Sequence, residues 1–146
     1  MTNINISKMT IDDLDSIKNI LETDFDNFWS YNILKEELNN PRSYYIIAKK
    51  NEEILGFAGI INTVDQYEIT NIVVKKNYRK KGVGTLLLNN LIEFVKKNKP
   101  EKIYLEVNCN NKSAIALYKK HGFIECGLRK KYYSNTDDAI LMHLQV

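Results

Sequence analysis

The sequence predicts an α/β (α+β) fold in which helices flank a mixed, mostly antiparallel central sheet. Residues 44–74 are rich in Tyr, Ile, Val and Phe and are interrupted only by short turn segments, as in antiparallel hairpins. Farther along the chain, two strand-like segments are separated by an amphipathic helical segment, which predicts a crossover between two parallel strands.

The N-terminal segment predicts a strand followed by a helix. Ile4 and Ile6 alternate with polar residues, as in a half-buried strand. Thr10 is a typical helix N-cap, and Asp12 and Asp13 follow in the first turn, where the helix dipole favours negative charge. The apolar residues expected along this helix are Leu14, Ile17, Ile20 and Leu21.

A second, shorter helix is expected to begin near Ser30 and to end before Pro41. Two polar segments, residues 50–52 and 63–66, are turn candidates that divide the next region into three antiparallel strands. The residues of the second helix that are expected to point inward are Ile33, Leu34 and Leu38.

The longest amphipathic segment, residues 85–97, predicts a central helix, and Pro100 ends it. Its apolar stripe consists of Leu87, Leu88, Leu91, Ile92 and Val95. The remaining segments are expected to form a strand at 102–107, a helix at 111–120 that stops at Gly122, and closing strands within 123–146 around a loop at 134–138.

The composition predicts a single domain over residues 1–146, expected to be cytoplasmic. The net charge of +3 is too small to indicate nucleic-acid binding, and the apolar runs are too short for a membrane helix. Cysteine and histidine are too sparse for metal-ligand spacing, so we expect no metal and reduced thiols. The residues concerned are Cys109, Cys126, His121 and His143.

The strongest chemical feature is the segment from Arg79 to Gly84, which follows a strand ending near Val74 and opens the central helix. Unpaired N–H groups at a helix start bind anions, and glycines let a phosphate approach the backbone closely. Five of the seven residues at 75–81 are basic, which adds attraction for a polyphosphate. The alternative is a solvated basic loop with a glycine turn.

Two other phosphate motifs do not fit this segment. The triphosphate loop requires Lys and then Ser or Thr after its last glycine, whereas Thr85 and Leu86 follow Gly84. The dinucleotide fingerprint requires a third glycine where this chain has Leu87.

Arg79, Gly82 and Gly84 match the Arg/Gln-x-x-Gly-x-Gly/Ala signature of the GNAT acetyltransferase superfamily, which the chain resembles. The resemblance implies acetyl-CoA as cosubstrate, with its diphosphate on the backbone of residues 80–85 and its pantetheine arm against residues 72–74. The binding residues so implied are Ile72, Val73, Val74, Arg79, Lys80, Lys81, Gly82, Val83, Gly84, Thr85, Asn111 and Tyr118.

The rest of the chain is most similar to RimI-type protein N-acetyltransferases. This resemblance implies transfer of an acetyl group to the α-amino group of a protein, with the N-terminal alanine of a small-subunit ribosomal protein as the usual acceptor. The matching positions are Trp29, Ser30, Asn71, Ile72, Leu105, Glu106, Val107, Asn111, Ala114, Leu117, Tyr118, Gly122, Phe123, Arg129, Tyr132, Tyr133, Asp138, Ala139 and Met142.

Acetyl transfer to an amine requires a base, because an α-amino group is mostly protonated at pH 7. The resemblance assigns this role to Glu106, and strand alternation places Glu106 on the face opposite Leu105. Tyr118 could protonate the leaving thiolate. The alternatives are a surface glutamate, a tyrosine that only packs against the sheet, and an Asn111 that only caps its helix. Aromatic residues that could line a peptide groove are Trp29, Tyr31, Tyr132 and Tyr133.

Other functions remain open on the sequence alone. The acceptor could be a lysine side chain, a polyamine or another small amine, because the sequence does not show the shape of the acceptor pocket. The chain could also be a coenzyme A-binding module without turnover, although the pair Glu106 and Tyr118 argues against it. A nucleic-acid module resting on residues 75–81 is a weaker third possibility. The oligomeric state is not predicted.

Overall fold

The computed structural model describes residues 3–25, 29–63, 66–98, 100–133 and 137–146, without the side chains of 131–133. The described strands form one seven-stranded sheet in the order β1-β2-β3-β4-β5-β7-β6, in which β4 and β5 pair in parallel and the other neighbours pair antiparallel. The mixed, mostly antiparallel sheet expected from the sequence is therefore confirmed. The strands are β1 (Ile4–Lys8), β2 (Ser43–Lys50), β3 (Glu53–Thr63), β4 (Gln66–Val74), β5 (Lys102–Asn108), β6 (Ile124–Tyr133) and β7 (Asp137–Gln145).

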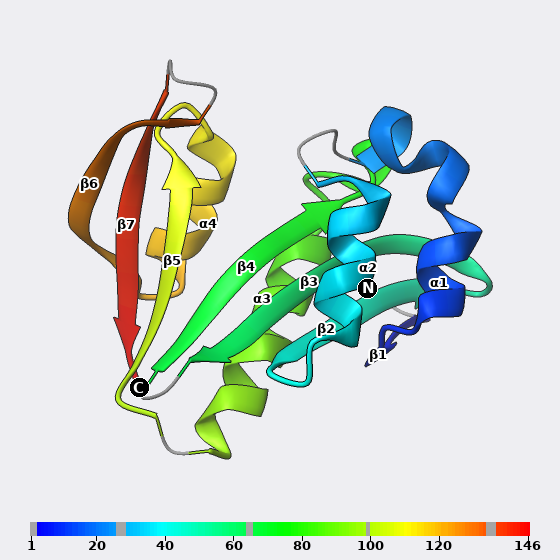
Figure 1. Cartoon of the computed structure of the whole chain (residues 1–146), viewed down its shortest axis with the longest axis horizontal. Coiled ribbons are helices and arrows are strands. Elements are labelled where there is room, and N and C mark those ends of the chain that lie inside the picture. The colour runs from blue at the N-terminus through cyan, green and yellow to red at the C-terminus, as the bar shows by residue number, and fades with distance from the viewer. Residues whose placement is uncertain (1–2, 26–28, 64–65, 99, 134–136) are drawn as a thin grey trace.

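Within the described segments, four α-helices flank the sheet: α1 (Ile11–Ser16), α2 (Tyr31–Asn39), α3 (Val83–Lys96) and α4 (Lys112–Lys120). Helices α1 and α2 lie on one face of strands β2 to β4, and α3 lies on the other (Figure 1). A 3₁₀ turn, η3 (Lys76–Tyr78), connects β4 to the loop before α3. None of the helices in the described segments is long and apolar enough to cross a membrane.

The first helix is shorter than the sequence predicts. Thr10 caps α1 through a reciprocal pair of hydrogen bonds with Asp13, as expected, but the helix ends at Ser16. A 3₁₀ turn, η1 (Lys18–Ile20), and a π turn, η2 (Leu21–Phe25), follow. Ile17, Leu21 and Phe25 are nevertheless all buried in one cluster, so burial rather than a single helical period sets the path of the chain.

The second helix begins after its Ser30 cap and ends before Pro41, as predicted. The prediction that Ile33 points inward is wrong: its exposed fraction is 44%, whereas Leu34 is 1% exposed. Leu34 and Leu38, four residues apart, share the inner face, and the 100° step between neighbours turns Ile33 away from it.

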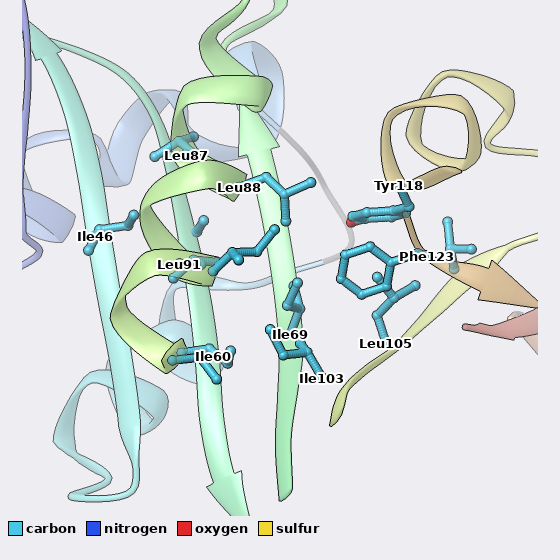
Figure 2. Close-up of a cluster of buried hydrophobic side chains, with 14 of the residues drawn as sticks. Ile46, Ile60, Ile69, Leu87, Leu88, Leu91, Ile103, Leu105, Tyr118 and Phe123 are labelled. Carbon is cyan, nitrogen blue, oxygen red and sulfur yellow. The ribbon is translucent and has the colours of Figure 1, made fainter. Parts of the chain in front are cut away.

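The larger core cluster fixes α3 and α4 against the same face of the sheet. Leu87, Leu88 and Leu91 of α3 are fully buried against β2, β3 and β4. Tyr118 and Phe123, at the end of α4, lie in the same cluster, with ring centroids 5.7 Å apart (Figure 2). The α4 end that carries Tyr118 is thus held by the core.

Strand β4 contains a bulge that places two consecutive side chains on one face. Gly59 of β3 pairs with Asn71 and the next residue pairs with Ile69, so Thr70 is the extra residue. The Tyr45 ring crosses Gly59, where a Cβ atom would lie 2.2 Å from the ring, and its hydroxyl lies 3.1 Å from Thr70 Oγ1.

The parallel pairing of β4 with β5 is short. It covers residues 67–69 of β4 and 103–105 of β5, after which the two strands diverge (Figure 1). On its other side, strand β5 pairs with β7 along its whole length, from Lys102 with Gln145 to Asn108 with Ala139.

Replacing Tyr45 with Phe should remove a loss of stability at alkaline pH. Burial raises the pKa of Tyr45 to about 12, while an unfolded tyrosine has a pKa of about 10. Above pH 10 the unfolded chain loses this proton first, so the free energy of unfolding falls as pH rises toward 12. Between pH 9 and 11.5, urea unfolding should show a loss about 2 kcal/mol larger in the unmodified protein than in Tyr45→Phe. Equal losses in both proteins would contradict this burial.

Candidate active site

Two cavities meet where β4 and β5 diverge. The first, of about 650 Å³, lies between the end of β4, the loop before α3 and the start of α4. The second, of about 720 Å³, lies between α2, β4, β5 and α4. We call the first the loop cavity and the second the acidic cavity. Both are lined by Ile72, Val73, Asn111, Ala114 and Tyr118, so they share a wall.

The loop cavity has the backbone of an anion site. Lys80 and Gly82 have positive φ values of 62° and 89°, and Gly82 is the N-cap of α3. No side chain caps α3, so the N–H groups of its first turn, at residues 83–85, stay available at the positive end of the helix dipole. Gly82, Gly84 and Thr85 line the cavity, together with the basic residues Lys76, Arg79 and Lys80.

Arg79 fastens this loop to the rest of the site. Its Nε donates to the carbonyl oxygen of Val74 at 3.0 Å, and its Nη2 donates to the carbonyl oxygen of Phe25 at 2.7 Å. These bonds tie the loop to the end of β4 and to η2. The guanidinium thus shapes the cavity, a role that its place in the motif does not reveal.

The other predicted loop residues differ in what they can offer. The Lys81 ammonium lies 5.5 Å from the centre of the Tyr78 ring, and the Val83 side chain is buried in the core. Neither side chain lines the loop cavity, so these two positions can contribute through the backbone. Ile72, Val73 and Val74, which the sequence predicts to contact the pantetheine arm, line the cavity.

Asn111 has two structural roles. Its Oδ1 accepts a hydrogen bond from the N–H of Ala114 at 3.2 Å and so caps α4. It also lines both cavities, so capping and ligand contact are compatible.

Glu106 and Tyr118, the predicted base and acid, both line the acidic cavity. The Glu106 side chain is 18% exposed, and its Oε1 lies 3.0 Å from Arg129 Nη2. Tyr118 is 7% exposed and belongs to the shared wall. The structure therefore brings the two predicted catalytic residues together beside the loop cavity.

The acidic cavity also contains residues for which the sequence predicted no role in the chemistry. Glu68 lies on β4, and its pKa is raised by burial first and by the negative charge of Glu106 second, against the opposing effect of Arg129. Asn71 is 8% exposed, and its side chain lies close enough to the Tyr45 hydroxyl to oppose the rise in the pKa of that group. In the sequence, Glu68 could have been noticed as an acidic residue inside an apolar strand. Only the structure shows that it lies in the same cavity as Glu106.

Of the four aromatic residues that could line a peptide groove, the structure describes the side chains of Trp29 and Tyr31. Trp29 lines the acidic cavity, next to the exposed Ile33. Tyr31 does not line it, because its hydroxyl donates to Asp15 on α1. The side chains of Tyr132 and Tyr133 lie outside those that the structure describes.

Comparison with known proteins agrees with this geometry. Residues 14–123 match the model of the acetyltransferase (GNAT) family. A Bacillus subtilis (strain 168) protein, provisionally named a ribosomal protein bS18-alanine N-acetyltransferase, is 32% identical over 143 residues, which cover 97% of this chain and 95% of that protein.

Solved structures agree as well. The ribosomal-protein-S18-alanine N-acetyltransferase from Escherichia coli has a TM-score of 0.88 and 31% identity, over 98% of this chain and 94% of that one. A GNAT acetyltransferase from Elizabethkingia anophelis with acetyl-CoA bound shares the fold, with a TM-score of 0.78 and 22% identity over the full length of both chains.

Replacing Gly84 with Ala should weaken coenzyme A binding without harming the fold. A Cβ at this position would meet Leu117 at 3.4 Å and Val74 at 3.8 Å, which are ordinary contacts, and alanine favours a helix by about 0.8–1 kcal/mol over glycine. The added methyl group would fill the space where a phosphate approaches the backbone.

We expect Gly84→Ala to be as stable as the unmodified protein or slightly more stable in thermal unfolding, and to bind coenzyme A at least tenfold more weakly in calorimetry. The exposed Asn89→Ala, farther along the same helix, is the matched control and should leave affinity unchanged. Unchanged affinity in Gly84→Ala would show that the ligand does not lie on this loop.

Proposed function

The chain belongs to the acetyltransferase (GNAT) family, and we propose that it transfers the acetyl group of acetyl-CoA to the N-terminal α-amino group of a protein. The observation that carries the proposal is the shared wall: an anion-binding loop cavity and an acidic cavity meet at Tyr118. We infer that the acceptor is the N-terminal alanine of a small-subunit ribosomal protein, because relatives named for that activity match nearly the whole chain.

Residues of the loop cavity fit the phosphates of the cosubstrate. The uncapped N–H groups at residues 83–85 and the positive φ of Gly82 form an anion cradle, and Lys76 and Lys80 add positive charge. Acetyl-CoA supplies an acetyl thioester, whose carbonyl carbon accepts an amine. We assign residues 72–74 to the pantetheine arm, since they lead from the loop to the shared wall.

Residues of the acidic cavity prepare the amine. An α-amino group with a pKa of about 8 arrives mostly as an ammonium at pH 7 and must lose a proton before it can act as a nucleophile. We assign Glu106 as a base, directly or through a water molecule, with Arg129 holding its carboxylate in place. We assign Tyr118 as the acid that protonates the leaving sulfur, because it lies between the two cavities.

The other candidate functions have less support. A coenzyme A-binding module needs no acidic cavity with a carboxylate and a phenol beside the binding loop. Lysine, polyamine and small-amine acceptors use the same chemistry, but the relatives that match nearly the whole chain are named for α-amino acetylation. A nucleic-acid module would leave Arg79 exposed, whereas its guanidinium donates to two backbone carbonyls. We place the reaction in the cytoplasm and treat residues 1–146 as one N-acetyltransferase domain.

Acetylation of short peptides tests the function. An alanine-starting ribosomal peptide incubated with acetyl-CoA should gain one acetyl group by mass spectrometry, and fragmentation should place it on the α-nitrogen. Glu106→Gln and Tyr118→Phe should each lower kcat by about 10²- to 10⁴-fold, because each removes one proton-transfer group. Their affinity for coenzyme A should stay within about twofold, since neither substitution touches the anion cradle.

The same peptide with a blocked N-terminus and an internal lysine is the control. It should gain no acetyl group. Acetylation of that lysine alone would instead identify a side-chain acetyltransferase. Equal background rates for the unmodified protein and Glu106→Gln would mean that the protein binds coenzyme A without catalysing acetyl transfer.

A further inference from the structure

A polar contact between α1 and α2, next to the acidic cavity, has no part in the proposed chemistry. The Tyr31 hydroxyl of α2 donates a hydrogen bond to the Asp15 carboxylate of α1, 16 positions earlier in the chain. Two ammonium groups also lie over the Tyr31 ring, with Lys18 Nζ 4.5 Å and Lys35 Nζ 5.9 Å from its centre. A cation within about 6 Å of an aromatic ring is attracted to it. Tyr31 is therefore held by three charged side chains, two of which precede α2 in the chain.

The first turn of α2 connects this contact to the cavity. Tyr31 and Ile33 are two residues apart, and a helical step of about 100° per residue places them on nearly opposite sides of α2. The Tyr31 hydroxyl reaches α1, whereas Ile33 lines the acidic cavity, and Trp29 lines it just before the helix begins. The Ser30 hydroxyl, between them in the chain, accepts a hydrogen bond from the Ile33 N–H at 3.2 Å. We call Trp29 and Ile33 the α2 wall of the acidic cavity.

Core packing alone leaves the rotation of α2 loosely defined. Leu14 of α1 and Leu34 of α2 are both buried in the cluster that the two helices share. Apolar contacts are not directional, so they hold the helices together but tolerate a small turn of one helix about its axis. A hydrogen bond is directional, and one to a carboxylate is about twice as strong as one between neutral groups. The bond from Tyr31 to Asp15 therefore sets the angle at which the α2 wall faces the cavity.

The Tyr31 hydroxyl keeps its proton over the whole neutral range. The hydrogen bond to Asp15 raises the pKa of Tyr31 above the ordinary tyrosine value of about 10, and desolvation of the phenol acts in the same direction. The donor of the contact is therefore present at every pH at which an α-amino group would be acetylated.

Resting on the proposed function, we propose that Tyr31 is a positioning residue for the acceptor: its hydrogen bond to Asp15 holds the α2 wall in the orientation that binds the acceptor peptide. Tyr31 lines neither cavity, so it acts through Trp29 and Ile33 and touches neither substrate nor cosubstrate. The proposed proton-transfer groups lie on other elements, Glu106 on β5 and Tyr118 on α4. Loss of the hydrogen bond should thus weaken binding of the acceptor and leave the chemical step intact.

Steady-state kinetics with an alanine-starting peptide and saturating acetyl-CoA test this role. Tyr31→Phe keeps the ring over which Lys18 and Lys35 lie, and removes only the hydroxyl. We expect KM for the peptide to rise about three- to tenfold, as for the loss of one hydrogen bond, while kcat and coenzyme A affinity stay within about twofold. Asp15→Ala should have the same effect. The double variant should be no worse than either single one, because both substitutions remove the same bond.

Two further variants separate positioning from structural damage. Asp15→Asn keeps an oxygen that can accept the hydrogen bond, so it should recover most of the affinity for the peptide that Asp15→Ala loses. Tyr44→Phe is the matched control. It removes a hydroxyl on the other face of the sheet, where the Tyr44 ring stacks on Phe94 of α3 with centroids 3.7 Å apart, and it should change neither KM nor kcat.

Tryptophan fluorescence reports on the α2 wall directly. Trp29 is the only tryptophan in the chain, so the intrinsic tryptophan emission comes from this wall. In the protein without peptide, Tyr31→Phe and Asp15→Ala should both change the emission maximum and its quenching by acrylamide. Tyr44→Phe should match the unmodified protein in both measurements.

An unchanged KM in Tyr31→Phe would overturn the inference, and so would a fall in kcat or in coenzyme A affinity as large as the rise in KM. Losses that add in the double variant would also overturn it, because they would reveal two separate effects. In each case, acetylation of the peptide by the unmodified protein would leave the proposed function standing.

If the unmodified protein does not acetylate the peptide, the proposed function fails by itself, and Trp29 emission then decides the inference. An unchanged spectrum in Tyr31→Phe would overturn the positioning role, and a changed one would support it.

Discussion

The divergence of β4 from β5 is the constraint on which the rest of the structure depends. The two strands pair in parallel only from Tyr67 to Ile69, whereas β5 pairs with β7 along its whole length. Without the separation, the backbone groups of β4 beyond Ile69 would pair with β5, and the acidic cavity could not form between them. The bulge at Thr70 contributes to the acidic cavity, because the consecutive residues Thr70 and Asn71 both line it.

Structural residues hold the walls of this opening in place. Arg79 bonds the anion loop to the end of β4 and to η2, so the loop cannot move independently of the strand. On the opposite wall, Tyr118 belongs to the core cluster that also fixes α3 (Figure 2). Core packing and backbone contacts therefore both help to position the two halves of the site.

Local signals in the sequence predicted much of the fold. The helix caps Thr10, Ser30 and Asn111 and the positive φ of Gly82 are encoded by individual residues, so they could be predicted without tertiary contacts. Features that depend on contacts between distant segments could not. The tie from Arg79 to Phe25 joins residues 54 positions apart.

The acidic cavity shows the same limit. Glu106 was predicted as a base from family resemblance, and in the structure it lines the acidic cavity. Its partner Arg129, and the electrostatic effect of Glu106 on Glu68, depend on the register of four strands, which no local pattern specifies. The break after Ser16 has a similar cause, because tertiary burial overrode a regular helical pattern. Ile33, in contrast, is exposed because the regular geometry of α2 turns it away from the face that Leu34 and Leu38 share.

The most direct test of two cavities that meet at one wall is the affinity of a bisubstrate compound, with coenzyme A joined through an acetyl bridge to the nitrogen of an alanine-starting peptide. If the phosphates occupy the loop cavity and the peptide occupies the acidic cavity at once, calorimetry should show the compound binding at least 100-fold more tightly than coenzyme A alone. Affinity no greater than that of coenzyme A would mean that the peptide part finds no site beside Tyr118, and would contradict transfer between these two cavities.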